Sequence, residues 1–159
     1  MLEMPENLRA QLRSQRLMQK QDTSRIRPIL QKAGLRPTKQ RLMLGQFLLS
    51  GHHQHISADD LHLLVLQCGF SMSLATVYNT LNQFAEAGLI RKISVSGQRT
   101  FFDTNARNHQ HFYFEDEDRM IDIGGAALML SPAPQAPEGY TISKIDILVS
   151  LKKVENKQL

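Results

Sequence analysis

The sequence predicts an α+β protein in which helices come first and strands follow. Before residue 90, three segments carry apolar residues three and four positions apart, the period of a helix with one buried face. After Gly88, apolar and polar residues alternate, as they do in strands. The charge divides in the same order: thirteen Lys and Arg against seven Asp and Glu up to residue 103 give +6, and six against eight from residue 104 onward give −2.

Start signals place the first two helices. The first is predicted to follow Thr38, and its apolar residues are Leu42, Leu44, Phe47 and Leu48. The second is predicted to begin at Ser57, because Ser57 and Asp60 have the spacing of a capping box, whose side chains satisfy backbone N–H groups in the first turn. It should end at Gly69, after an apolar stripe of Leu61, Leu64, Val65 and Cys68.

The third helix is predicted between Ser73, which is placed to cap it, and Gly88, which is placed to end it. Its apolar residues are Leu74, Val77, Leu81 and Phe84. Its opposite face is polar and lacks carboxylates, and it consists of Thr76, Tyr78, Asn79 and Asn82. That face is therefore available to contact another molecule.

A hairpin should follow the third helix, with its turn at Ser96-Gly97-Gln98, where glycine is typical of such loops. Three helices and a hairpin describe a winged helix, whose third helix enters the major groove of DNA. Arg91, Lys92 and Arg99 on the hairpin are then available for phosphates, and DNA binding would depend strongly on salt. For the charge alone, a soluble domain with an ordinary positive excess is the alternative.

Short ordered motifs resemble the ferric uptake regulator family over about Ile26 to Leu151. Together they are more specific than any one of them. A closer likeness to the iron response regulator branch rests on Tyr-Asn after Thr-Val, Phe-Tyr after the histidines and Ile-Ser-Lys-Ile-Asp near the C-terminus. The family motifs are Ala33-Gly34-Leu35-Arg36-Pro37-Thr38-Lys39-Gln40-Arg41, His55-Ile-Ser-Ala-Asp-Asp-Leu, Ala75-Thr76-Val77-Tyr78, Glu86-Ala87-Gly88-Leu89-Ile90 and His109-Gln110-His111.

The resemblance implies a homodimer that binds an inverted-repeat site in double-stranded DNA. It implies a winged-helix DNA-binding domain over residues 26–104, after an N-terminal extension of residues 1–25. It also implies a small α/β dimerisation and sensor domain over residues 105–159.

The resemblance assigns roles at the DNA as well. Arg36 is expected to approach the minor groove, and Arg41 and Thr76 to contact the DNA backbone. Tyr78 and Asn79 are expected to lie at base edges. These roles differ, because backbone contacts position a protein on DNA and base contacts specify the sequence.

The family's structural zinc site, built on Cys-x-x-Cys pairs, is excluded. Phe114 and Glu117 stand at the positions of the first pair, and the only cysteine of the chain is Cys68. Cys68 lies on a predicted apolar stripe and is interpreted as a small core residue. A second family metal site is not expected either, because its positions carry Asn108, Gln110 and Ile145.

One metal site between the domains remains. By the resemblance, its ligands are His55, Asp103, His109, His111 and Asp122. His109 and His111 are two positions apart, so they share a face if they lie on a strand. Imidazole and carboxylate without sulfur suit Fe(II), Mn(II), Co(II) or Zn(II), and ligand type alone does not choose among them. Without the resemblance, the two histidines would be interpreted as a solvated strand edge.

Haem is the competing ligand, because the resembled branch is associated with haem at its histidine cluster. His109 or His111 could give one axial nitrogen to the iron. The chain has no Cys-Pro haem motif, and Gln110 replaces the middle histidine of the branch's usual run. A divalent ion and haem therefore both remain open.

These observations predict a cytoplasmic transcription regulator of iron or haem metabolism, not an enzyme. No apolar stretch approaches the ~20 residues that cross a membrane, the N-terminus is polar, and one cysteine argues against disulfides. Two alternatives stay open. One is a constitutive DNA-binding protein with a vestigial sensor site. The other is a divalent-metal enzyme, disfavoured because the metalloprotease, phosphate-loop and nucleophile-elbow motifs are absent.

The remaining segments carry weaker patterns. Residues 1–25 carry a weakly amphipathic pattern. This segment could pack on the winged-helix domain, lie along DNA or be disordered. Gly124 to Gly139 predicts a short helix at most, then a loop. Tyr140 to Leu151 predicts a strand with one face buried between subunits. Glu115 to Asp118 predicts a solvated hairpin turn.

Overall fold

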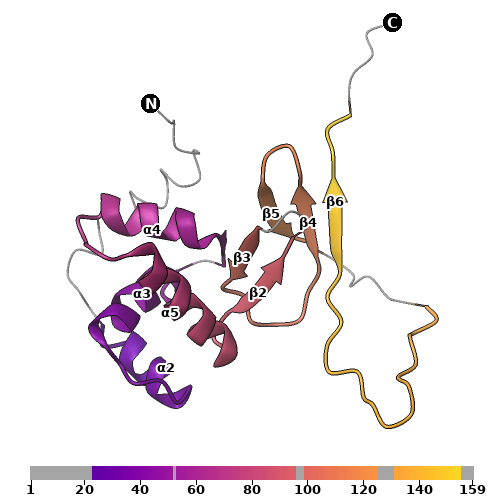
Figure 1. The fold of residues 1–159 in the computed structure, drawn as a ribbon, viewed down its shortest axis with the longest axis horizontal. Helices are drawn as coiled ribbons and strands as arrows, with labels where there is room; N and C mark the ends of the chain where they lie inside the picture. The colour runs from indigo at the N-terminus through magenta and orange to yellow at the C-terminus, as the bar shows by residue number, and fades with distance from the viewer. Residues whose placement is uncertain (1–22, 52, 96–98, 125–130, 155–159) are drawn as a thin grey trace, which may run out of the picture. The chain divides into compact units, whose positions relative to one another are not determined.

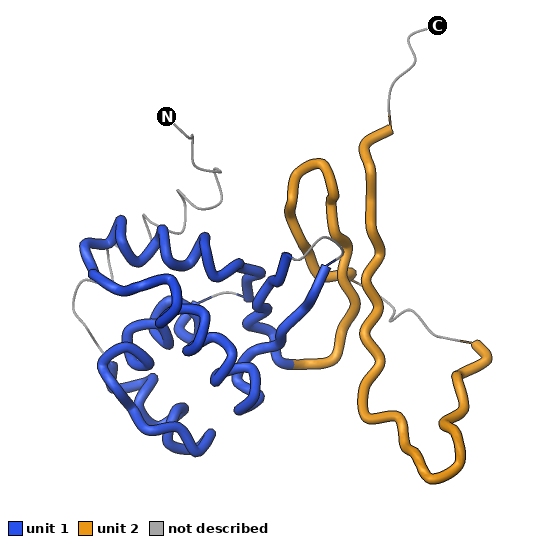
Figure 2. Tube along the Cα trace, in the orientation of Figure 1, with its two compact units in different colours: residues 1–106 blue, residues 107–159 orange. Residues whose placement is uncertain are grey.

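The chain separates into two compact units. Unit 1 comprises residues 1–106 and unit 2 residues 107–159 (Figure 2). Helices with a small sheet in unit 1 and a second small sheet in unit 2 confirm the predicted α+β class. The residues that the computed structural model describes are 23–51, 53–95, 99–124 and 131–154. The N-terminal extension of residues 1–25, with its weakly amphipathic pattern, lies almost wholly outside them.

Unit 1 contains helices α2 to α5 in its described part (Figure 1). Their bounds are Ile26–Lys32, Lys39–Leu49, Ala58–Gln67 and Leu74–Glu86. The predicted caps Ser57 and Ser73 are confirmed, since each side chain accepts a hydrogen bond from the backbone N–H three residues on. Beyond α5, Gly88 has a φ of +72°, which favours glycine, and the helix ends before it as predicted. Helix α2 was not predicted, because seven residues are too few to show a period.

A three-stranded antiparallel sheet completes unit 1, in the order β1-β3-β2. Its strands are β1 (His55–Ile56), β2 (Arg91–Ser94) and β3 (Thr100–Asp103). Strands β2 and β3 are the predicted hairpin, and the predicted turn at residues 96–98 lies outside the described residues. Strand β1 was missed, because two residues show no alternation.

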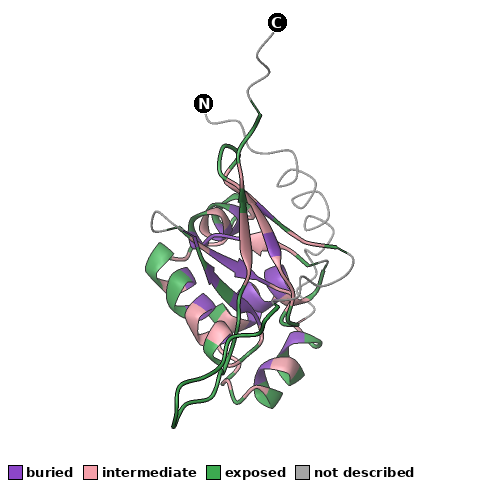
Figure 3. Cartoon of the chain, turned by 90° about the vertical axis from the view of Figure 1, so that its right-hand side faces the viewer, coloured by how far each residue is buried: buried purple, intermediate pink, exposed green. Residues whose placement is uncertain are grey.

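The core of unit 1 consists mainly of apolar residues on the inner faces of its helices. Figure 3 shows the buried residues in purple. The predicted stripes of α3 and α4 are buried, although Cys68 at the end of α4 is only half-buried. Leu74 was wrongly assigned to the buried apolar stripe of α5: it is 39 % exposed, and its neighbour Ala75 is also exposed, because burial of this helix begins only at Val77. Gly45 lies against Ile26, and a Cβ on Gly45 would be 2.5 Å from Ile26 Cγ2. Helices α2 and α3 therefore approach closely at this glycine.

Unit 2 contains a sheet in the order β5-β4-β6. Its strands are β4 (His111–Phe114), β5 (Arg119–Asp122) and β6 (Leu148–Leu151). Strand β4 pairs antiparallel with β5 and parallel with β6. The acidic residues 115–118 form the turn between β4 and β5, as predicted.

Two predictions for unit 2 need correction. The strand expected from Tyr140 begins only at Leu148, and residues 131–146 are exposed (Figure 3). The alternation of apolar residues is broken because Ile142 and Ile145 are three positions apart. His109 precedes β4 and does not lie on it. Within the described residues, no helix is long and apolar enough to cross a bilayer.

Candidate functional site

The outer face of α5 is the first candidate site. Val77, Leu81 and Phe84 are fully buried and hold this helix in the core of unit 1. Tyr78 and Asn79 lie on the opposite side of the helix, with Tyr78 42 % exposed and Asn79 also exposed. A cleft of about 650 Å³ opens on this face, lined by Ser57, Ala58, Asp59, Leu74, Ala75, Tyr78, Asn79, Arg99 and Thr100.

Tyr78 is held by side chains of the neighbouring sheet and helix. Its ring meets the ring of Phe102 edge-on, with 6.4 Å between centroids, and Lys92 Nζ lies 5.5 Å from the Tyr78 ring centroid. The same Nζ donates to Asn82 Oδ1 at 2.9 Å. Asn82 Nδ2 in turn donates to the carbonyl of Tyr78 at 3.0 Å. Helix α5 and strand β2 are thus joined at the outer face of unit 1.

Arg41, which we expected at the DNA backbone, makes hydrogen bonds within unit 1. Its Nε and Nη2 both donate to Gln83 Oε1, at 3.1 and 2.9 Å, and its Nη1 donates to the carbonyl of Arg36 at 2.9 Å. The guanidinium therefore ties α3 to α5. Arg36 itself is exposed, and the hydroxyl of Thr76 lies 2.8 Å from that of Ser73 at the start of α5.

The three cations of the hairpin differ in exposure. Arg91 is only 9 % exposed, so the prediction that it is available for phosphates was wrong. Alternate residues of β2 face the interior, and Arg91 occupies an inward position opposite Asp103. Lys92 is exposed but bonded to Asn82, and the Nη2 atom of Arg99 lies 3.5 Å from Asp60 Oδ2.

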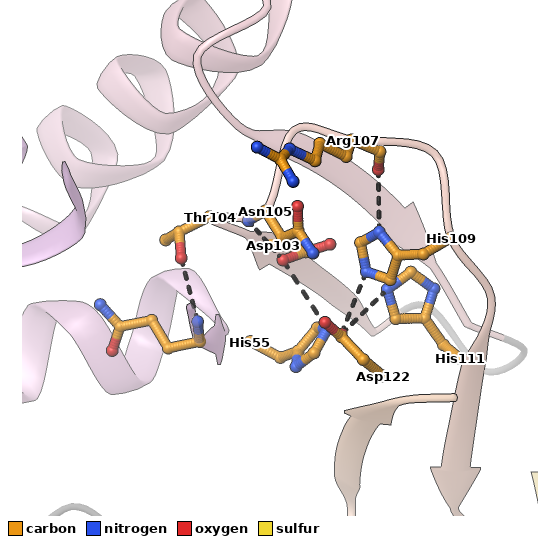
Figure 4. Close-up of polar contacts among 9 residues, drawn as sticks. His55, Asp103, Thr104, Asn105, Arg107, His109, His111 and Asp122 are labelled. Carbon is orange, nitrogen blue, oxygen red and sulfur yellow. Dashed lines mark hydrogen bonds and ion pairs between the residues drawn. The ribbon is translucent and has the colours of Figure 1, made fainter. Parts of the chain in front are cut away.

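A first histidine and aspartate group, the unit 1 pair, consists of His55 and Asp103. The two residues face each other across β1 and β3, with 3.8 Å between His55 Nε2 and Asp103 Oδ1. Asp103 is fully buried, and its Oδ1 accepts the backbone N–H of Asn105 at 2.7 Å (Figure 4). Beside the pair, Thr104 and Gln54 exchange two hydrogen bonds that hold β1 at this edge.

A second group, the unit 2 trio, consists of His109, His111 and Asp122. Asp122 Oδ1 lies 3.0 Å from His109 Nε2 and 3.7 Å from His111 Nε2 (Figure 4). The two imidazole centroids are 4.4 Å apart. His109 Nδ1 lies 2.8 Å from the carbonyl of Arg107, a contact that orients the ring. Although His109 lies outside the strand, both histidines turn their Nε2 atoms toward the same carboxylate.

The donor atoms of each group are of kinds that bind divalent cations. The unit 1 pair offers one imidazole and one carboxylate, and the unit 2 trio offers two imidazoles and one carboxylate; nitrogen and oxygen without sulfur suit Fe(II), Mn(II) or Zn(II). The backbone N–H of Asn105 donates to Asp103, and the backbone carbonyl of Arg107 accepts from His109; contacts of this kind orient metal ligands. Cys68 packs against the core of unit 1 and belongs to neither group.

The arrangement of unit 1 defines its class. Helices α3 to α5 followed by the β2–β3 hairpin form a winged helix, the DNA-binding fold that the sequence predicted. The ferric uptake regulator family matches residues 32–150, and the chain belongs to that family.

Individual relatives agree with this assignment. The ferric uptake regulation protein of Shigella flexneri is 36 % identical over 95 residues, which are 59 % of this chain and 64 % of that protein. The chain thus spans less than two thirds of that relative. The ferric uptake regulator of Pseudomonas aeruginosa, solved with manganese, is 26 % identical with a TM-score of 0.59, covering 79 % of this chain and 96 % of that one. The Vibrio cholerae regulator has the same fold, at 23 % identity, a TM-score of 0.62, and 80 % and 98 % coverage.

Sequence reasoning missed the polar contacts that hold Tyr78 and Arg41. These contacts are made by Lys92, Asn82 and Gln83. Pairing between residues 10 and 42 positions apart leaves no periodic signal in one sequence.

Proposed function

We propose that the chain is a transcription regulator of iron or haem metabolism that binds DNA as a homodimer at an inverted-repeat operator. The observation that carries this proposal is the exposed face of α5, with Tyr78 and Asn79 outward, in a winged helix of this family. The protein regulates and does not catalyse, and it acts in the cytoplasm, where the DNA is.

At the operator, Tyr78 and Asn79 read base edges and Thr76 contacts the backbone beside them. Arg36 is exposed and enters the minor groove. Arg41 contacts the backbone while bonded to Gln83. This assignment is supported by the outward face of α5 and by the exposure of Arg36.

The sensor ligand is one divalent ion held by the unit 1 pair and the unit 2 trio together. All five residues supply nitrogen or oxygen, and the manganese in the Pseudomonas aeruginosa structure makes Mn(II) the first ion to test. The ion changes DNA affinity only as far as it binds one arrangement of the two units better than another.

Haem is the second candidate ligand, because of the likeness to the iron response regulator branch. His109 or His111 would give one axial nitrogen to the iron. His109 is 14 % exposed and His111 4 %, so His109 is the more accessible of the two. Haem at the trio would displace the contacts to Asp122 and release the operator.

The test is operator affinity with Mn(II), with haem and with neither. It is measured for the wild type, for a His109→Ala, His111→Ala double variant and for His53→Ala as an exposed histidine control. We expect the wild type and the control to respond to at least one ligand and the double variant to lose that response. Identical responses in all three proteins would favour constitutive DNA binding with a vestigial sensor.

Assembly is tested separately. We place residues 140–151, which include exposed Ile142 and Ile145, between the two subunits. Sedimentation at micromolar concentration should give a dimer. A monomer with and without ligand would refute this part of the proposal.

A further inference from the structure

Lys92 occupies an unusual position among the cations of unit 1. It is exposed on β2, where a lysine could meet a phosphate, yet its ammonium is engaged by two groups of α5. Nζ donates to Asn82 Oδ1 at 2.9 Å and lies 5.5 Å from the centroid of the Tyr78 ring. An ammonium beside an aromatic ring is attracted to it.

Asn82 completes the arrangement. It lies one helical turn after Tyr78, and its Nδ2 donates to the Tyr78 carbonyl at 3.0 Å while its Oδ1 accepts from Lys92. Both ends of the Asn82 amide are therefore used within the protein. Asn82 thus links Lys92 to the backbone of α5, and Tyr78 and Asn79 remain as the exposed residues of this face.

We propose that Lys92 is a positioning residue for base reading. It holds the Tyr78 ring and the Asn82 amide on α5, and neutralising a phosphate is not its main contribution to operator binding. The inference rests on the proposed function, because it assumes that α5 reads DNA.

The ring contacts show why positioning matters here. An exposed tyrosine exchanges between rotamers, and ordering it on binding lowers affinity. Tyr78 already meets the buried Phe102 ring at 6.4 Å, and Lys92 supplies a second contact from the neighbouring strand. Holding the ring before DNA arrives lowers the cost of placing it at a base edge. Random DNA gains nothing from this, because it offers no matching base.

The experiment compares Lys92→Met with the wild type on two duplexes of equal length. One is an operator selected by the wild type from random DNA in the presence of Mn(II), and the other is a shuffled sequence. Lys32→Met serves as the matched control, since Lys32 is exposed at the end of α2, away from α5. Affinities are measured at several salt concentrations.

We expect Lys92→Met to weaken operator binding about three- to tenfold relative to Lys32→Met, the size of one exposed cation–ring contact or of one hydrogen bond. Binding to the shuffled duplex should fall no more than in the control. Asn82→Ala should give a similar loss, and the double variant should lose no more than either single one. Lys92→Arg should retain operator binding, because a guanidinium can contact both the Tyr78 ring and the Asn82 amide.

Other outcomes would overturn the inference. Equal losses on both duplexes, with a salt slope smaller by about 0.9, would make Lys92 a phosphate contact. Additive losses in the double variant would also refute it. A wild type that selects no operator would refute the proposed function itself. If the wild type is selective and Lys92→Met has the same ratio of operator affinity to shuffled-duplex affinity, only the role of Lys92 would be refuted.

Discussion

Replacing Gly45 with alanine should destabilise unit 1, although alanine is the better helix former. The new Cβ would stand 2.5 Å from Ile26 Cγ2, about 1 Å inside the ordinary carbon contact distance. Ile26 is 1 % exposed and β-branched, so its methyl group has little room to turn away. Overpacking of this kind costs about 1–3 kcal/mol, and alanine recovers about 1 kcal/mol of helix propensity. The net loss should be about 1 kcal/mol.

The sign of this effect should reverse when Ile26 is first replaced by alanine. Without Cγ2 the clash disappears, so Gly45→Ala should then stabilise that variant by about 1 kcal/mol. Urea unfolding followed by far-UV circular dichroism measures both steps, because every described helix belongs to unit 1. Equal stabilisation in both backgrounds would show that α2 and α3 do not approach as closely as the structure places them.

Three further predictions concern the cap, the metal and the acidic turn. Ser73→Ala removes the acceptor for the Thr76 N–H, and should lower the free energy of unfolding by about 1 kcal/mol in urea. Mn(II) at 100 times its Kd should raise the stability of the wild type by about 2.7 kcal/mol in calorimetry. At the same Mn(II) concentration, the Asp122→Asn variant should gain less stability than the wild type. An equal gain in stability would show that Asp122 is not a ligand. The hydrogen bond from Arg119 holds the pKa of Glu117 below its ordinary value, so any stability that Glu117 adds is complete above that value and is lost as the pH falls through the lowered pKa. Arg119→Met should return the pKa of Glu117 toward normal in an NMR titration.

Periodicity and capping residues predicted most of unit 1, because the signals that start, bury and end a helix lie within a few neighbouring residues. The caps at Ser57 and Ser73 and the end at Gly88 were all readable from a few neighbouring residues. Strand β1 and helix α2 were not, since both are too short to show a period. In unit 2 the exposed stretch before β6 could not be predicted, because apolar residues spaced as Ile145 and Ile147 are suggest a strand whether or not another strand pairs with it.

The candidate site divides in the same way. The residue types at His55, Asp103 and the unit 2 trio were recognisable by resemblance, but the exclusion of His109 from β4 depends on where the pairing with β5 and β6 begins. Burial of Arg91 follows from which face of β2 meets the core, and composition cannot give that.

Two polar residues near the C-terminal end of α5 connect this helix to other elements of unit 1. Gln83 receives the guanidinium of Arg41 from α3, and its neighbour Asn82 receives the ammonium of Lys92 from β2. Two adjacent amides on α5 therefore bind cations from two different elements of unit 1. Because the apolar core already fixes the depth of α5 through Val77, these polar bridges act on its outer side. A substitution at either amide should therefore alter DNA recognition more than it alters the fold.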